Sequence, residues 1–275
     1  MAATTKKEQA VYSHGHHKSV VQDHARRTAR DSAAFLLPHI KPNSTILDVG
    51  CGPGTITADL AALVPQGSVI GCDPVESVLS QATSYAASRG LSNVTFEKVD
   101  ANALPYADET FDIVTCHQVL QHVSDPVGIL REMRRVVKRG GLVAAREADY
   151  ATFAWYPEPK ELARWAELYQ MVAKTNGGEP NAGRYCHVWA RQAGFDGEEV
   201  EATWDHWRYA DERVRQFSES WAGRILQPGF LRTAVDKGFA SEEEIRGISE
   251  AWKKWGTQED AFFAIPHGQI LCRKS

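Results

Sequence analysis

Residues 46–55, Ile-Leu-Asp-Val-Gly-Cys-Gly-Pro-Gly-Thr, constrain the fold more than any other stretch of this 275-residue chain. The apolar run followed by glycines predicts a strand and a tight turn, and the residues from Thr55 to about position 62 predict a helix. Gly50 and Gly52 leave backbone without a side chain in the turn, while the first turn of the helix offers N–H groups that have no partner within the helix. This strand, turn and helix predict a pocket for a nucleotide-like ligand.

Two classes of ligand use such a turn, and its spacing and charge favour one of them. A dinucleotide fingerprint, G-x-G-x-x-G/A, needs a small residue where this chain has Thr55, because the last glycine stands one position earlier, at Gly54. Asp48, beside the turn, would repel a pyrophosphate but suits a ligand with positive charge. S-adenosylmethionine carries an ammonium and a sulfonium group. The turn therefore favours S-adenosylmethionine over NAD.

Two further predicted strands end in an acidic residue. Residues 68–73 end at Asp73, and residues 94–100 end at Asp100. Ligands of open α/β sheets bind outside the carboxyl ends of the strands, so Asp73 can accept hydrogen bonds from ribose hydroxyls and Asp100 one from an adenine amino group. The fourth and fifth strands are expected at 111–118 and 141–145.

Taken together, these motifs resemble those of the class I S-adenosylmethionine-dependent methyltransferases, most closely the ubiquinone- and menaquinone-biosynthesis-like branch that methylates small molecules. The resemblance covers about residues 44–147, through ILDVGCGPGT, VIGCD, VDANALPY, FDIVTCHQVLQHV and LREMRRVVKRGGLV. Any one of these motifs is weakly specific, whereas the combination is highly specific.

The resemblance implies how the cofactor is surrounded. The glycine turn would line the methionine moiety, the acid of the second strand would bind the ribose, the end of the third strand would contact the adenine edge, and the end of the fourth would form the floor beneath the sulfonium. The cofactor-binding residues expected on this basis are Asp48, Gly50, Gly52, Gly54, Thr55, Asp73, Pro74, Asp100, Ala101, His117 and Gln118.

The predicted fold is α/β, with a Rossmann-like, mostly parallel sheet of seven strands and helices on both faces. The expected segments are an N-terminal leader with a lid helix (1–43), the cofactor-binding core (44–147), a substrate-side segment with the sixth strand (148–210), a helical insertion (211–257) and the final strand (258–275). Other expected elements are a leader helix at 19–37, a helix at 159–175, a sixth strand at 199–209 and a seventh at 262–273. A hairpin would join the last two strands more simply, so we expect the insertion to cap the active-site mouth.

Five residues outside the core are candidates to contact the substrate. Trp155 and Tyr156 follow the fifth strand, near the edge where the methyl group is expected, and Arg184 could bind an acid or a phenolate. Tyr12 in the leader and Trp221 in the insertion could also touch the acceptor. Three of them have a structural alternative: packing of the leader for Tyr12, a salt bridge for Arg184 and burial under the insertion for Trp221.

A catalytic base is needed only for some acceptors. A hydroxyl acceptor would need one, whereas an amine or a thiolate might need none. His17 and His117 are the candidates for this role, and His122 and His267 are further titratable histidines near the predicted strand ends. For any one of them, a hydrogen-bonded structural histidine is the more common role.

Composition excludes several classes of partner. A net charge of −4 and a pI near 6.2 argue against a nucleic-acid substrate. The five cysteines lack metal-ligand spacing and are expected to be reduced, and the histidines at 14, 16 and 17 have no partner ligands nearby, so no metal is expected. No apolar run is long enough for a membrane helix, and residues 1–11 show no signal segment. A cytoplasmic location is expected, and the oligomeric state stays open.

The sequence thus predicts transfer of a methyl group from S-adenosylmethionine to a small organic acceptor with an oxygen, nitrogen or sulfur nucleophile. The tryptophans and tyrosines outside the core favour an aromatic or partly apolar acceptor. Two alternatives stay open: carbon methylation of a quinone-like ring, and a catalytically idle regulatory protein that only binds the cofactor.

Overall fold

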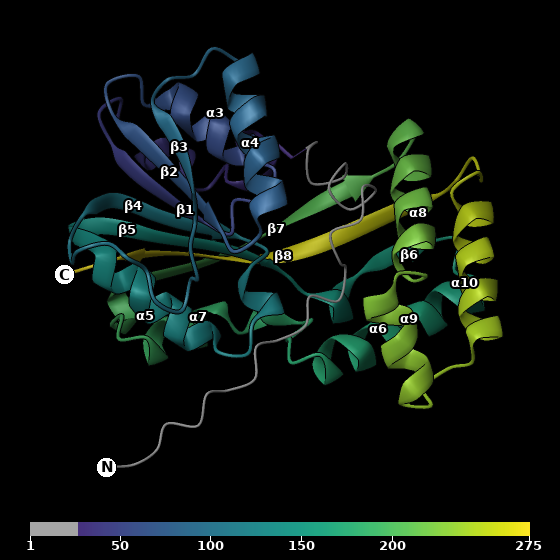
Figure 1. Ribbon diagram of the computed structural model, residues 1–275. Coiled ribbons are helices and arrows are strands. Elements are labelled where there is room, and N and C mark those ends of the chain that lie inside the picture. The colour runs from purple at the N-terminus through teal and green to yellow at the C-terminus, as the bar shows by residue number, and fades with distance from the viewer. Residues whose placement is uncertain (1–26) are drawn as a thin grey trace.

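The computed structural model describes residues 27–275, which form a central sheet with a group of helices at one end (Figure 1). The strands are β1 (Thr45–Val49), β2 (Ser68–Asp73), β3 (Val94–Lys98), β4 (Phe111–His117), β5 (Val137–Ala148), β6 (Ala154–Tyr156), β7 (Val200–Tyr209) and β8 (Phe262–Arg273). Their order is β3-β2-β1-β4-β5-β8-β6, and β7 pairs with the other edge of β8. The first five strands are parallel, and β8 is antiparallel to its three neighbours. The mostly parallel α/β sheet is therefore confirmed.

The strand order reverses between β1 and β4, which lie side by side although β2 and β3 come between them in sequence. In open α/β sheets a crevice forms outside the carboxyl ends of the strands at such a switch point. The glycine turn after β1 and the end of β4 meet there.

Helices cover both faces of the sheet (Figure 1). One face carries α2 (Ala29–Ser32), α3 (Thr55–Leu63) and α4 (Glu76–Ser88), and the other carries α5 (Pro126–Val136) and α7 (Cys186–Gln192). Side chains alternate across β1: Ile46 packs on the α2 and α3 side, whereas Leu47 and Val49 pack on the α5 side. All five cysteines are buried and free of disulfides, as expected.

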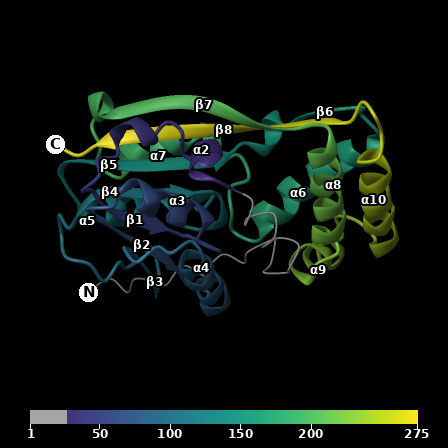
Figure 2. The same ribbon diagram turned by 90° about the horizontal axis from the view of Figure 1, so that it is seen from above.

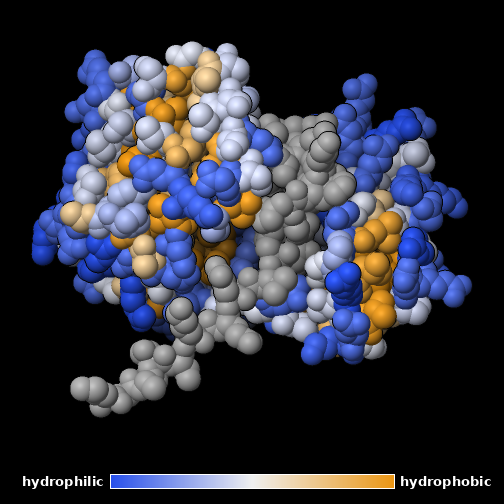
Figure 3. Space-filling model, viewed as in Figure 1, coloured by the Kyte–Doolittle hydropathy of each residue, from blue (hydrophilic) through white to orange (hydrophobic). Residues whose placement is uncertain are grey.

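A second core lies at the end of the sheet. Between β7 and β8 the chain forms α8 (Glu212–Arg224), α9 (Pro228–Asp236) and α10 (Glu242–Trp255), which pack with α6 (Lys160–Thr175). The helical insertion is confirmed, and so is the core role of the apolar stripe on α6, because Trp165 is fully buried. Figure 2 shows β8 running from this helical group to the far end of the sheet. Figure 3 shows polar side chains over most of both regions, with smaller apolar areas between them.

Two expectations differ from the structure. The sheet has eight strands instead of seven, because residues 154–156 form β6, which pairs with Phe262–Ala264 of β8. The leader helix expected at 19–37 is described only from residue 27 onward, where Thr28 caps the short helix α2 with reciprocal hydrogen bonds to Asp31, and α2 ends at Ser32 instead of reaching Leu37. Within residues 27–275, no helix combines the length and the apolar character needed to cross a bilayer.

Candidate functional site

The turn after β1 has three glycines in the left-handed region, with φ of 71° at Gly50, 52° at Gly52 and 75° at Gly54. A Cβ on Gly50 would lie 2.4 Å from a methyl of Val119, so this glycine is required by packing. A Cβ on Gly52 would meet no atom within 4 Å, so the backbone there faces open space. That space, next to the first turn of α3 and its buried first residue, Thr55, can accommodate a ligand.

Asp48 is buried in β1, with 3% of its surface exposed, and accepts a hydrogen bond of 2.6 Å from Thr57 Oγ1 in α3. Burial raises the pKa of Asp48 from 3.8 to about 7; the Thr57 hydrogen bond lowers it and the charge of Asp73 raises it further. A positively charged ligand would favour the ionised form.

Asp73, the last residue of β2, is half-buried and accepts hydrogen bonds from Gly52 N–H at 3.2 Å and Val75 N–H at 2.9 Å, one on each carboxylate oxygen. A carboxylate is a pure acceptor of hydrogen bonds, so Asp73 suits ligand hydroxyls. The interaction with Gly52 also ties the glycine turn to the end of β2.

The residues expected around adenine lie on the neighbouring strand ends. Pro74 is exposed directly after β2, and the Val99 N–H donates to the Asp73 carbonyl at 3.3 Å, which holds the segment after β3 against it. Asp100 is exposed and accepts from both the backbone and the side chain of Asn102, at 3.0 and 2.7 Å, while Ala101 is half-buried. The acids at the ends of β1, β2 and β3 thus share one edge of the sheet.

The end of β4 is held in place by hydrogen bonds. His117, the last residue of β4, is half-buried, and its ring lies 5.2 Å from that of Trp207. Gln118 has a φ of 53°, its N–H donates to the Arg146 carbonyl at 2.8 Å, and its side-chain nitrogen lies 2.9 Å from His267 Nε2. Sequence reasoning listed His267 as titratable but did not predict this contact.

Glu147, a residue that sequence reasoning missed, supports the loop after β4. Its fully buried carboxylate accepts the backbone N–H groups of Val119 and Leu120 at 2.9 Å and of Gln121 at 3.1 Å. Burial raises its pKa to about 7, although these hydrogen bonds lower it. Nothing in the local pattern of β5 distinguishes this residue from an exposed glutamate.

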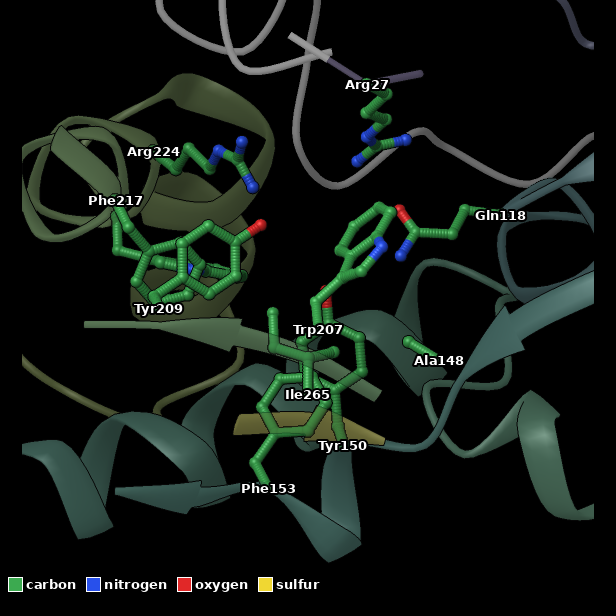
Figure 4. A pocket seen from close by; sticks show the side chains of 11 residues that line it. Arg27, Gln118, Ala148, Tyr150, Phe153, Trp207, Tyr209, Phe217, Arg224 and Ile265 are labelled. Atoms are coloured by element: carbon green, nitrogen blue, oxygen red, sulfur yellow. The ribbon is translucent and has the colours of Figure 1, made fainter. Parts of the chain in front are cut away.

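An aromatic pocket opens next to this edge, and Figure 4 shows its lining side chains. It holds about 380 Å³ of space, part of it open to solvent. The described residues that line it are Arg27, Gln118, Ala148, Tyr150, Phe153, Trp207, Tyr209, Phe217, Trp221, Arg224 and Ile265. The pocket therefore joins the end of β4 to β7, β8 and the helical insertion.

The five residues expected to contact the substrate differ in their position relative to the aromatic pocket. Trp221 lines the pocket and is also buried in the second core. The described lining residues do not include Trp155, which stacks on Phe263 at 5.8 Å, or Tyr156, which is 58% exposed. Arg184 forms the structural salt bridge, with hydrogen bonds of 2.5 and 2.6 Å to the buried carboxylate of Asp149. Tyr12, and with it the candidate base His17, lies outside the described residues.

Two histidines, the half-buried His122 and the fully buried His267, are neutral near pH 7. Burial lowers the pKa of His122 to about 3, and Arg27 and Arg224 lower it further. Burial also places the pKa of His267 well below its ordinary value, with added contributions from Arg146 and Arg27. Both histidines are therefore structural hydrogen-bonding groups near a concentration of positive charge.

Comparison with known proteins agrees with this geometry. Residues 40–213 match a family model described as a methyltransferase domain. An uncharacterized methyltransferase of Schizosaccharomyces pombe is 34% identical over 97% of this chain and 98% of its own length. A demethylmenaquinone methyltransferase of Lactococcus lactis is 33% identical over 55% of this chain and 65% of its own length. Among solved structures, a Bacillus halodurans protein named as a candidate methyltransferase has a TM-score of 0.58 at 20% identity, covers 86% of this chain and 96% of its own, and shares the fold.

Proposed function

Because the chain belongs to the S-adenosylmethionine-dependent methyltransferases, we propose that it methylates a small aromatic or partly apolar acceptor bound in the pocket beside Gln118. Gln118 carries this proposal: it directly follows β4, whose end is expected to lie beneath the sulfonium, and its side chain lines the aromatic pocket. The cofactor edge and the acceptor pocket therefore meet at one residue.

The residues after β1, β2 and β3 fit the cofactor. Asp48 and Asp73 offer carboxylates to a cation and to ribose hydroxyls, Gly52 faces open space, and Asp100 with Ala101 stands where the adenine edge would lie. The bound cofactor would supply an electrophilic methyl group. We propose the set expected from the sequence, from Asp48 to Gln118, as the cofactor-binding residues.

The protein's contribution would be alignment and exclusion of water. Positioning two reactants at near-attack geometry can lower a barrier by about 7 to 11 kcal/mol. Aromatic side chains such as Tyr150, Phe153 and Phe217 give the acceptor an apolar environment. A hydroxyl acceptor would also need to lose a proton, and His117 remains the candidate base within residues 27–275, because the pKa values of His122 and His267 are lowered far below the range of a base active near pH 7.

Calorimetry and a transfer assay test this function. We expect the wild type to bind S-adenosylmethionine and S-adenosylhomocysteine, and Asp73→Ala to bind both at least tenfold more weakly while keeping a cooperative thermal transition. Transfer of a labelled methyl group to a small aromatic compound would exclude an idle binding protein. A folded wild type with no affinity for either compound would overturn the proposal.

One observation favours carbon methylation of a quinone-like ring as a second candidate. The Lactococcus lactis relative is named for demethylmenaquinone, although the similarity spans 55% of this chain. Assays with a reduced naphthoquinone in liposomes and with water-soluble aromatic compounds separate the two candidates. Turnover of only the soluble compounds would dismiss the quinone.

A further inference from the structure

Resting on the proposed function, we propose that the acceptor is an aromatic compound that carries an anionic oxygen group, a carboxylate or a phenolate, which binds between Arg27 and Arg224. Arg27 precedes α2, and Arg224 is the last residue of α8. Both line the pocket, and Figure 4 shows their guanidinium groups pointing toward the space between them.

The pocket has cationic side chains and no acidic ones among the described residues that line it. Arg224 is 8% exposed and its guanidinium lies 5.0 Å from the ring centre of Trp221. Arg27 lies 5.0 Å from the ring centre of Trp207. Guanidinium groups match the planar geometry of carboxylates and stack on aromatic faces, so this arrangement suits an acid attached to a ring.

A third arginine adds to the positive charge beside Trp207, a residue that lines the pocket. Arg146 on β5 is 1% exposed, and its guanidinium lies 4.7 Å from the ring centre of Trp207. Within residues 27–275, none of its three side-chain nitrogens has a hydrogen-bond partner, and one of them lies 3.7 Å from a carboxylate oxygen of the partly exposed Asp205. Burial lowers the pKa of Arg146 to about 10, so it is still charged at neutral pH.

Trp207 connects these cations to the acceptor space. Its indole N–H donates to the Asp31 carbonyl at 2.8 Å, which fixes the ring at the junction of β7 and α2. The indole lies within 5.0 Å of both the Arg27 and the Arg146 guanidinium groups and lines the pocket. An anion beside this ring would offset the charge of the buried Arg146 guanidinium.

The rest of the pocket suits an aromatic ring. Tyr209 and Phe217 stack with ring centres 4.1 Å apart, and the rings of Tyr150 and Phe153 meet at a tilt with centres 4.3 Å apart. The pocket thus has apolar walls and a cationic end, which match the two ends of an aromatic acid. This field would also lower the pKa of a phenol, so a phenolate acceptor would need no histidine base.

Binding measured on protein saturated with S-adenosylhomocysteine tests the proposal. The probes are benzoate- and naphthoate-type carboxylates, acidic phenols, and the neutral carboxamide or O-methyl counterpart of each. We expect the anionic member of a pair to bind at least tenfold more tightly, and higher salt to reduce this preference. The carboxylate and phenol series, compared with each other, identify which anion the site prefers.

Arginine variants test which residues cause the preference for anionic over neutral compounds. Arg224→Gln and Arg27→Gln should each weaken binding of the anions about tenfold and leave the neutral compounds within twofold, and Arg224→Lys should restore part of the loss. Arg213→Gln, an exposed position on the same helix, is the matched control. S-adenosylhomocysteine affinity should stay unchanged in all four.

Equal binding of acids and their neutral counterparts, unchanged anion affinity in both Gln variants, or no binding by any probe would overturn this inference. Retained cofactor binding and turnover of a neutral acceptor would then leave the proposed methyl transfer intact. Loss of cofactor binding in the wild type would instead overturn the proposed function itself.

Discussion

Thr57 Oγ1 donates a hydrogen bond of 2.6 Å to Asp48 Oδ2, which joins the buried end of β1 to α3 beneath the glycine turn. Even with this hydrogen bond, burial keeps the pKa of Asp48 near 7. The chain thus holds a carboxylate in an unfavourable environment at the position expected to face a cationic ligand, and several measurable properties follow.

Cofactor affinity should increase as the pH rises from 6 to 8. A cationic ligand favours ionised Asp48, and with a pKa of about 7 only part of the unliganded protein is ionised at neutral pH. If only this form binds, affinity at pH 8 should exceed that at pH 6 by about tenfold. Calorimetry in buffers of different ionisation enthalpy would detect the released proton. In the Asp48→Asn variant only the ligand's own groups still titrate, so the pH dependence of its affinity should be smaller. A pH dependence as large as that of the wild type would assign the effect to another group.

Asp48→Asn should also stabilise the fold at alkaline pH. The pKa in the folded protein lies above the ordinary value of 3.8, so the folded state binds more protons than the unfolded state between about pH 4 and 7, and the free energy of unfolding falls as the pH rises through that range. Removing the charge should raise the free energy of unfolding at pH 8 by on the order of 1 to 3 kcal/mol, with little difference below pH 4. Urea unfolding at both pH values measures this. A less stable variant at pH 8 would contradict it.

Glu147→Ala should destabilise the protein and impair the loop that carries Gln118. It removes the acceptor of three backbone N–H groups, two of which belong to the buried residues Leu120 and Gln121. We expect a loss of roughly 2 to 4 kcal/mol in the free energy of unfolding, and lower turnover at temperatures where the variant is folded. Glu201→Ala, on the exposed part of β7, should change stability by less than about 0.5 kcal/mol. Equal effects of the two substitutions would refute the role of Glu147.

The second core depends on Trp165. Its ring lies 4.6 Å from that of Trp221 and 4.8 Å from that of Trp252, measured between ring centres. Trp165→Ala should lower the free energy of unfolding by about 3 to 5 kcal/mol. Trp204→Ala provides the contrast, because Trp204 is 53% exposed and its removal should cost under about 1 kcal/mol. Chemical denaturation followed by circular dichroism compares them.

Local pattern predicted the strands well where burial is continuous. The last strand, at 262–273, has the expected bounds, and Asp48 and Asp73 lie at one edge because parallel strands place their carboxyl ends together. By contrast, β6 has only three residues, and its pairing depends on Phe263, more than a hundred positions away in the sequence. So short a strand has no periodicity to detect.

The pocket could not be predicted either, because the segments that line it are brought together only by tertiary packing. The alternation at 199–209 places large residues on both faces, but only the pairing of β7 with β8 puts Trp207 next to Ile265 and close to His267. Arg27 and Arg224 line the same pocket although they lie far apart in the sequence. Local patterns indicate which residue types are present, whereas tertiary packing decides which of them share a pocket.

Gly52→Ala and Gly54→Ala should separate ligand binding from folding. Both glycines have positive φ, so either substitution carries a backbone cost of roughly 1 kcal/mol. At Gly54 the new methyl would also lie 2.6 Å from Cβ of Ala82. The Gly54→Ala variant should therefore lose several times more free energy of unfolding than Gly52→Ala. At Gly52 it meets no protein atom within 4 Å and projects into the space proposed for the cofactor, so this variant should fold but bind S-adenosylhomocysteine at least tenfold more weakly. Thermal unfolding and calorimetry on both variants measure the two effects, and wild-type affinity in folded Gly52→Ala would show that the cofactor does not lie against this glycine.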